Sequence, residues 1–551
     1  MIRGMKILLP ALLAVISCGE KVPEPTPQDV ENSRKKEEIS ALLGRVGATK
    51  TVETFDYTDW PSYTAGNESW CKRATLTKRQ LKSNKVEGSG CFVFDYTFTG
   101  QTTDPSKPEL LYVQRVFDSW RSDFSFSSLG ISFWVKGMPS NAGALRLVLL
   151  HDDRYSLGSQ TVRQTYQCTD TFESLKSTEW TRVVFPFDWF EPYNDAAKSV
   201  KMDLGKVIGW RLEIVNTKAV ASSTNQFMID CMEQLTSYVP QWNTKARFNS
   251  LFVQIHDIAD YRNMDWDDFM AIGKSVGIDT WFIPYSVGHK EESAVSFFSS
   301  CTLPRITKKM DMLDKMVAAA EKAGCKIIFG PDCQYYASNK ADKSHYEGML
   351  ATNKIVIDDL AAAFGSSPAF GGWYIADEFW DGGWKSDAAT EALGWYLENT
   401  AVYMKSKKDA DVCIAPALWR GFSAKVCGQW FESLFTRTRN GGKQVIDYLY
   451  LQDCGGRGPS TWTCVEVDFP NWYGEIKSAC ERTGVHFGID LESFMQNALL
   501  GIDYRAKTWE EVKLQLQMAG AFTEYITNFS YATFKPGTPA FEGYKEYYNS
   551  L

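Results

Sequence analysis

Two adjacent carboxylates, Asp377 and Glu378, end an apolar run within the stretch GGWYIADEFW, and Trp380 follows them. A second stretch, GIDLESF, carries Asp490 and Glu492 two residues apart. Paired carboxyl groups can hydrolyse a glycosidic bond, because one protonates the leaving oxygen while the other attacks the anomeric carbon or activates water. This chemistry requires a fold that brings the two stretches to one place.

Eight strand-like segments separated by helical patterns follow residue 245. They are 250–257, 279–287, 325–332, 370–378, 411–419, 447–453, 485–493 and 524–532. Strands that alternate with helices predict a parallel sheet, and eight such units in about 300 residues predict a (β/α)8 TIM barrel. A doubly wound open sheet is the alternative, although no G-x-G-x-x-G follows the first strand. In TIM barrels the reactive groups project from the C-terminal ends of the strands.

Glu378 closes the fourth predicted strand and Glu492 the seventh, so we expect them to face each other across the mouth of the barrel. We assign Glu378 as the catalytic acid/base and Glu492 as the nucleophile. A separation of ~5–5.5 Å would predict retention of configuration, and ~6.5–9.5 Å inversion. Asp377, with Trp373 and Trp380 nearby, is expected to make Glu378 the better proton donor.

Other side chains at the predicted strand ends are candidates for binding the substrate. They are Asp377, Trp373, Gln452, Asp453, Asp490, Arg420, His256 and Trp419. Structural roles compete with several of these assignments. His256 on an apolar strand can be a hydrogen-bonded core residue, and Gln452 with Asp453 can cap the turn at Cys-Gly-Gly. Arg420 can pair with a neighbouring acid, and Asp490 can support the seventh-strand glutamate, contact a ligand or be satisfied by backbone donors.

The strand-end motifs resemble known families. Glutamates at the ends of strands four and seven are typical of glycoside hydrolase clan A. GWYIADE, LQDCGG and DLESF are similar to motifs of a family of uncharacterised bacterial lipoproteins with a TIM-barrel glycoside hydrolase domain. The resemblance covers residues 245–545 and implies a retaining hydrolase of a poly- or oligosaccharide. Asp377 departs from the clan, which usually places Asn before the strand-four glutamate.

The first residues predict export. MIRGMKILLPALLAVISC has Arg3 and Lys6 ahead of an apolar run, and small residues ahead of Cys18. This pattern predicts a lipoprotein signal peptide over residues 1–18 with lipidation of Cys18, and an ordinary signal peptide with a chance Cys is the alternative. Residues 19–50 are Pro-rich and charged, which predicts a flexible tether.

Two folded domains are expected after the tether. Residues 51–240 carry short β-rich segments separated by Gly, Asn, Asp and Ser, which predicts a jelly-roll-like β-sandwich. Residues 245–551 form the predicted barrel. We expect an exported lipoprotein of the outer membrane, on its periplasmic or cell-surface face, attached to the membrane by lipid.

The amino-acid composition indicates which classes of ligand the protein can bind. The net charge of −8 becomes −10 when the two cations Arg3 and Lys6 are removed, and no basic run suits nucleic acid. The 19 tryptophans favour a carbohydrate partner. Thirteen cysteines without a C-x-x-C pair and only five histidines give no support for a zinc site, and we expect no cofactor and no metal. A non-catalytic glycan-binding lipoprotein and a metal-assisted hydrolase are the alternative functions.

Overall fold

The computed structural model describes most of the chain. The described residues are 26–56, 63–71, 74–117, 123–153, 161–255, 261–288, 293–334, 336, 338–456, 465–497 and 502–551. Arg45–Leu551 form one compact unit, separate from the preceding segment that contains helix α1 (Pro27–Leu43). No helix in the described ranges is long and apolar enough to cross a bilayer. The predicted signal peptide and Cys18 lie outside the described residues.

Helix α1 occupies much of the segment predicted as a flexible tether, so that prediction is corrected. Thr26 and Asp29 form a reciprocal capping box, and Glu31 accepts a hydrogen bond from Arg34 at 2.8 Å. Leu42 is the one buried residue of this helix. The helix is therefore supported by its cap and by charge pairs along its surface rather than by a packed face.

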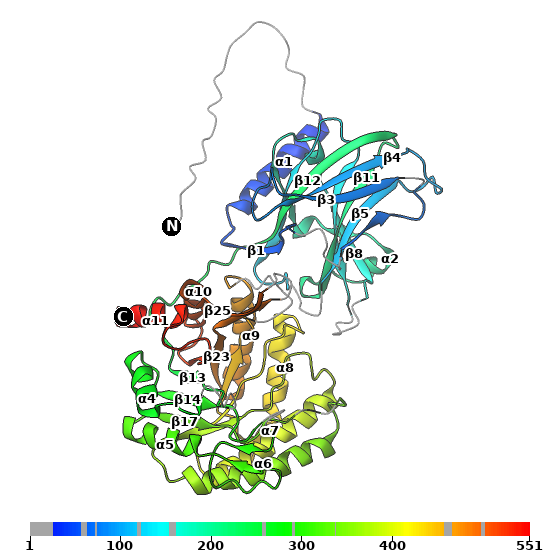
Figure 1. Ribbon diagram of the computed structural model, residues 1–551. Coiled ribbons are helices and arrows are strands. Elements are labelled where there is room, and N and C mark those ends of the chain that lie inside the picture. The colour runs from blue at the N-terminus through cyan, green and yellow to red at the C-terminus, as the bar shows by residue number, and fades with distance from the viewer. Residues whose placement is uncertain are drawn as a thin grey trace. The chain divides into compact units, whose positions relative to one another are not determined.

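Two antiparallel six-stranded sheets follow, as the sandwich prediction requires (Figure 1). One sheet has the order β3-β4-β12-β6-β9 with β1 paired to β12, and the other has the order β10-β8-β7-β11-β5-β2. The strands are β1 (Ala48–Glu53), β2 (Tyr63–Asn67), β3 (Thr75–Leu81), β4 (Cys91–Phe98), β5 (Glu109–Val116), β6 (Ser128–Lys136), β7 (Ala144–His151), β8 (Gln164–Thr169), β9 (Thr181–Pro186), β10 (Glu191–Pro192), β11 (Val207–Asn216) and β12 (Ser222–Thr236). Short helical turns join them at η1 (Ser174–Lys176), η2 (Phe187–Trp189), α2 (Asp195–Lys198) and η3 (Leu204–Lys206). Aromatic and branched side chains from both sheets form the core between them.

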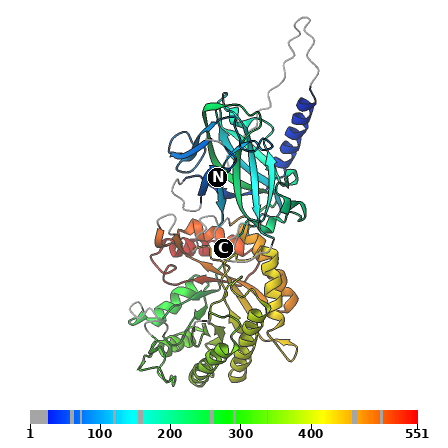
Figure 2. The same cartoon turned by 90° about the vertical axis from the view of Figure 1, so that its right-hand side faces the viewer.

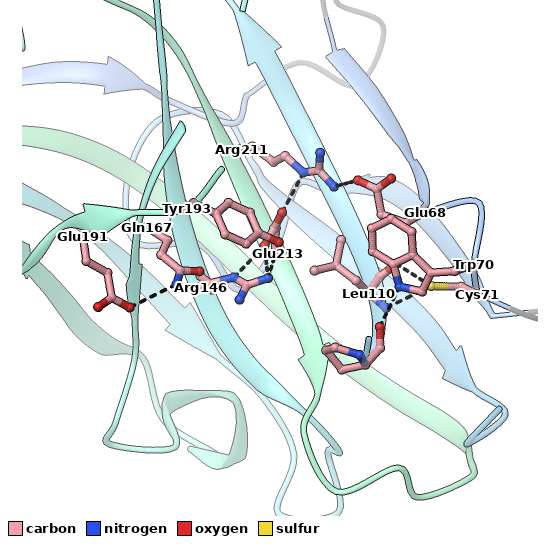
Figure 3. A network of polar contacts seen from close by, with 11 residues as sticks. Glu68, Trp70, Cys71, Leu110, Arg146, Gln167, Glu191, Tyr193, Arg211 and Glu213 are labelled. Atoms are coloured by element: carbon pink, nitrogen blue, oxygen red, sulfur yellow. Dashed lines mark hydrogen bonds and ion pairs between the residues drawn. The ribbon is translucent and has the colours of Figure 1, made fainter. Parts of the chain in front are cut away.

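The second sheet carries buried charges on the face that points away from this core (Figure 3). Glu213 on β11 is fully buried, accepts a hydrogen bond from Arg146 Nε at 2.6 Å and pairs with Arg211 Nε at 2.9 Å. Burial raises the pKa of Glu213, while the two arginines lower it. Tyr193 accepts a hydrogen bond from Arg146 at 2.7 Å. The charges of this face therefore compensate one another.

Eight parallel strands close into a barrel at each of the predicted positions (Figure 2). They are β13 (Ser250–Phe252), β14 (Thr280–Ile283), β17 (Lys326–Phe329), β18 (Phe370–Ile375), β19 (Val412–Ile414), β22 (Tyr448–Gln452), β23 (His486–Glu492) and β26 (Ile526–Phe529). Since β26 pairs with β13, the sheet is closed and the open doubly wound alternative is excluded.

Helices lie between the barrel strands in the chain and around them in space (Figure 2). They are α4 (Trp266–Ser275), α5 (Met312–Ala323), α6 (Lys343–Phe364), α7 (Asp387–Lys407), α8 (Ala424–Thr436), α9 (Asp468–Thr483), α10 (Trp509–Ala519) and α11 (Pro539–Asn549). Three two-stranded ribbons decorate the loops: β15 (Val295–Ser296) with β16 (Lys308–Lys309), β20 (Arg439–Asn440) with β21 (Lys443–Gln444), and β24 (Phe494–Asn497) with β25 (Ile502–Ala506).

Alternation along β18 decides which side chains reach the barrel interior. Tyr374 and Ala376 pack inside the barrel with residues such as Phe252, whereas Trp373 and Ile375 belong to the core between the barrel and its helices. Successive side chains of a strand point to opposite faces. The same alternation, continued past the end of the strand, separates the two acids that follow.

Buried ion pairs connect the sandwich to the barrel. Lys50 on β1 donates a hydrogen bond to one carboxylate oxygen of Asp468 at the start of α9, and the other oxygen accepts from Arg420 at 3.1 Å. All three side chains are at most 5% exposed. Asp123, in the sandwich, also accepts a hydrogen bond from the backbone N–H of Ala424 at 2.8 Å. The sandwich therefore contacts the segment between β19 and α8.

Candidate functional site

A cavity of about 530 Å³ opens where the barrel strands end. The residues that line it come from the ends of all eight strands or the loops after them: Phe252, Gln254, Pro284, Tyr285, Cys333, Gln334, Tyr336, Lys340, Tyr374, Ala376, Glu378, Trp380, Trp419, Gln452, Asp490 and Phe529. Aromatic rings and a few polar groups form its wall. Such a cavity is large enough for a small organic ligand.

Acids from β18 and β23 share this cavity. Glu378 lies three residues past the end of β18 and is exposed. Asp490 on β23 is fully buried, and neither of its carboxyl oxygens has a hydrogen-bond partner among the described residues. Burial raises the pKa of Asp490 well above its usual range, and the charges of Asp453, Glu492 and Glu378 raise it further. Glu378 and Asp490 therefore line one cavity, whereas the prediction paired Glu378 with Glu492.

Glu492 is the last residue of β23 and lies on the same face as Asp490, because the two are separated by two positions in the strand. Its side chain is 6% exposed and accepts a hydrogen bond from the Gly456 N–H at 2.8 Å. Its backbone carbonyl accepts one from Lys507 Nζ at 2.8 Å. Glu492 is not among the residues that line the cavity. Protein groups therefore hold it in place beside Asp490.

Asp453 shapes the loop that holds Glu492. Its Oδ1 accepts a hydrogen bond from the Gly455 N–H at 2.8 Å, and its Oδ2 accepts one from Gln515 at 2.8 Å. Burial raises the pKa of Asp453, and the charge of Lys507 opposes this. A Cβ on Gly456 would lie 2.0 Å from the Phe494 carbonyl oxygen, so this position requires glycine.

Gln452 and Asp453 thus differ although they are neighbours in the chain. Gln452 lines the cavity and donates a hydrogen bond to the Ala415 carbonyl at 2.6 Å. Asp453, which is 3% exposed, takes the turn-capping role that its position before Cys-Gly-Gly allowed. Its contact with substrate is corrected to a positioning role.

Asp377 and Trp373 face the helices instead of the cavity. Asp377 Oδ1 accepts a hydrogen bond from the Gln334 N–H at 2.7 Å, and Tyr396 on α7 donates its hydroxyl to Oδ2. Burial raises the pKa of Asp377 to about 7. Trp373 is fully buried and donates its indole N–H to the Lys408 carbonyl at 3.1 Å. Both residues therefore have structural roles in place of the predicted substrate contacts, and the effect of Asp377 on Glu378 stays a prediction.

Arg420 and Trp419 are neighbours in the chain but also have different roles. Arg420 is 4% exposed, has a positive φ of 51° and pairs with Asp468, which is the structural role weighed against a sugar contact. Trp419 lines the cavity, with its ring centroid 5.9 Å from that of Trp380. His256 lies outside the described residues.

Sequence reasoning missed several residues of the site. Lys340 and Tyr336 line the cavity from the loop between β17 and α6, and Lys507 lies buried beside Glu492. A lysine in a loop belongs to no hydrophobic pattern that would predict its position. The aromatic residues near Lys340 in the sequence were the available sign that it lies at a binding site. Within the described ranges no group of three His, Cys, Asp or Glu residues could hold a metal ion. The eleven described cysteines are free, and nine of them are buried.

The chain belongs to the family described as "Domain of unknown function (DUF4434)", which matches residues 249–542. A stretch of 96 residues is 36% identical to the uncharacterized protein YbcH of Escherichia coli (strain K12), covering 16% of this chain and 31% of that protein. The chain therefore spans about a third of the length of this curated relative.

Solved structures with partial similarity to the chain include glycoside hydrolases and carbohydrate-binding modules. A protein from Bacteroides thetaiotaomicron VPI-5482 assigned as an alpha-L-fucosidase is 18% identical, with a TM-score of 0.43, over 57% of this chain and 98% of its own. The CBM22-1–GH10 modules of Clostridium thermocellum xylanase 10B are 10% identical, with a TM-score of 0.34, over 91% and 97%. The family 11 carbohydrate-binding module of the same organism is 15% identical, with a TM-score of 0.25, over 34% and 95%. At these values the similarities carry no argument about chemistry.

Proposed function

We propose that the barrel hydrolyses a glycosidic bond of a poly- or oligosaccharide bound in the cavity. The observation that carries this proposal is the arrival of Glu378 from β18 and Asp490 from β23 in one aromatic-lined cavity, with Glu492 held beside Asp490. Trp380 and Trp419 supply flat apolar faces against which a sugar ring can lie. Carboxyl groups near such rings can act on a bound acetal.

The two glutamates differ in environment in a way that suits two roles. Glu378 is exposed to the cavity and can exchange protons with solvent, which an acid/base must do in each half of a double displacement. Glu492 is buried and oriented by the Gly456 N–H, which suits a nucleophile that must attack along one direction. We propose retention of configuration, which requires the carboxyl groups of Glu378 and Glu492 to lie ~5–5.5 Å apart when the sugar is bound.

Asp490 supplies a third carboxyl group with a different task. Because burial and three neighbouring acids raise its pKa, we propose that it stays protonated and donates a hydrogen bond to the sugar. This assignment also gives a partner to a buried group that has none among the described residues.

The test is sugar release from a panel of polysaccharides by the wild type, Glu378→Gln and Glu492→Gln, with proton NMR at the anomeric centre. We expect the wild type to cleave one substrate and to form first the product anomer that has the configuration of the substrate. Both variants should lose at least a thousand-fold in kcat. Glu321→Gln, on the exposed side of α5, is the matched control and should remain active. Glycan binding without cleavage, with equal affinity in all four proteins, would instead identify a binding protein.

We also propose that the chain is an exported lipoprotein of the outer membrane, attached through Cys18. The basic and apolar pattern of the first 18 residues supports this. Metabolic labelling with a fatty acid should label the wild type and not Cys18→Ser, and the variant should leave the membrane fraction. Labelling of both proteins alike would reject the proposal.

A further inference from the structure

Lys340 places its ammonium group over three aromatic rings at the cavity wall. Its Nζ lies 4.5 Å from the ring centroid of Trp384, 5.1 Å from that of Tyr336 and 5.4 Å from that of Trp380. The lysine and Tyr336 come from the loop between β17 and α6, and the two tryptophans from the segment between β18 and α7. Ring faces attract a cation, so these contacts fix the ammonium in position.

Among the residues that the structure describes, no carboxylate pairs with Lys340. No ion pair or side-chain hydrogen bond of its Nζ occurs among the described residues, although Glu378 and Asp490 line the same cavity. Burial lowers the pKa of Lys340. Glu378 and Asp490 therefore line the cavity without forming an ion pair with this cation.

A half-buried ammonium has lost part of its hydration, and aromatic rings replace that hydration incompletely. An ammonium carries three N–H donors, and no side chain among the described residues accepts a hydrogen bond from those of Lys340. A carboxylate would satisfy both the charge and the donors, whereas a sugar hydroxyl would satisfy only a donor.

We infer that Lys340 forms a subsite for the carboxylate of an acidic sugar whose ring lies against Trp380. The substrate class is then a glycan that contains uronic acid residues. This inference rests on the proposed function in that it takes the ligand to be a carbohydrate, but it concerns binding and not cleavage.

The test is isothermal titration calorimetry with the full chain in a Glu378→Gln background, so that a bound glycan is not cleaved. The probes are tetrasaccharides of glucuronic, galacturonic and mannuronic acid, each beside its methyl ester, which keeps the ring and removes the charge. We expect at least one acid to bind at least ten-fold more tightly than its ester. Lys340→Met should remove that preference and leave the affinity for the ester unchanged.

Lys343→Met is the matched control. Lys343 is the exposed first residue of α6, and its Nζ lies 4.7 Å from the ring centroid of Trp395 without lining the cavity. This variant should bind acid and ester as the unsubstituted background does. Lys340→Gln, which keeps a polar end without charge, should behave as Lys340→Met does, and circular dichroism should show each variant folded.

Equal affinity for every acid and its ester overturns the inference, and so does the absence of binding to both. A Lys340→Met variant that loses affinity for the ester by the same factor as for the acid would overturn it too, because the lysine would then serve only the packing of the loop. Cleavage of neutral glycans with no effect of Lys340→Met would keep the hydrolase and reject the subsite. A Lys340-dependent preference for an acid that the wild type never cleaves would keep the subsite and count against the hydrolase.

Discussion

Asp377→Asn tests whether the acid behind the fourth barrel strand makes the fold less stable as the pH rises. Asp377 is 2% exposed, and burial raises its pKa from 3.8 to about 7 despite hydrogen bonds from Tyr396 and Gln334. At about 1.4 kcal/mol per pKa unit the difference corresponds to ~4 kcal/mol. Asparagine has nearly the same shape and does not titrate.

The sign follows from where the proton is bound. Below pH 3.8 the folded and unfolded chains both hold it, and Asp377 causes no difference. Between pH 3.8 and about 7 only the folded chain holds it, so the free energy of unfolding of the wild type falls as the pH rises. About 3 kcal/mol of this loss falls between pH 4.5 and pH 8. The free energy of unfolding of Asp377→Asn, relative to the wild type, should therefore rise by ~3 kcal/mol over that interval.

The assay is urea denaturation at pH 4.5, 5.5, 6.5 and 8, followed by tryptophan fluorescence and by far-UV circular dichroism. Asp311→Asn is the control, because Asp311 is an acid at the start of α5 whose side chain is 60% exposed. A difference between wild type and Asp377→Asn that stays constant across the four pH values would refute the argument from burial.

A loop glycine, a cavity tryptophan and a sandwich lysine allow three further tests. Gly456→Ala should lower kcat at least ten-fold, because its Cβ would displace the N–H that holds Glu492, while Gly348→Ala, on an open helix surface, should leave kcat unchanged. Trp419→Ala should raise the KM of a cleaved glycan through the loss of ~1–3 kcal/mol of ring contact, and an unchanged KM would contradict the stacking role. Lys50→Met should lower the free energy of unfolding by ~3–5 kcal/mol, and an unchanged urea midpoint would show that the ion pair with Asp468 is dispensable.

The positions of the barrel strands could be predicted from the sequence because buried parallel strands are uninterrupted apolar runs. β18 and β23, for example, lie entirely within the predicted segments 370–378 and 485–493. Helix α1 carried a readable signal as well, since Thr26, Pro27 and Asp29 form a standard helix start, but charge and proline content favoured a tether.

The facing of individual side chains was predicted less well. Asp377 and Trp373 were assigned to the cavity because they are close to Glu378 in sequence, yet side chains alternate with a period of two. If Glu378 points into the barrel, its neighbour Asp377 must point towards the helices. The alternation could therefore have predicted the position of Asp377.

Partners that are distant in the chain could not be predicted. Arg420 meets Asp468, and Lys507 meets the backbone of Glu492, only because the loops above the strands fold over one another. Lys340 likewise reaches Trp384 from another loop. No local pattern encodes such contacts, since each depends on the path of two separate loops.

The ion pairs of Lys50, Asp468 and Arg420 have a consequence for how this architecture is inherited. A barrel that lost its sandwich would keep an acid and an arginine whose third member is gone, at the base of the loop that carries Trp419. Homologues without the sandwich should therefore replace Asp468 and Arg420 together, and homologues with it should keep all three charges. The sandwich and the barrel would then keep these charges only where both halves of Arg45–Leu551 are present.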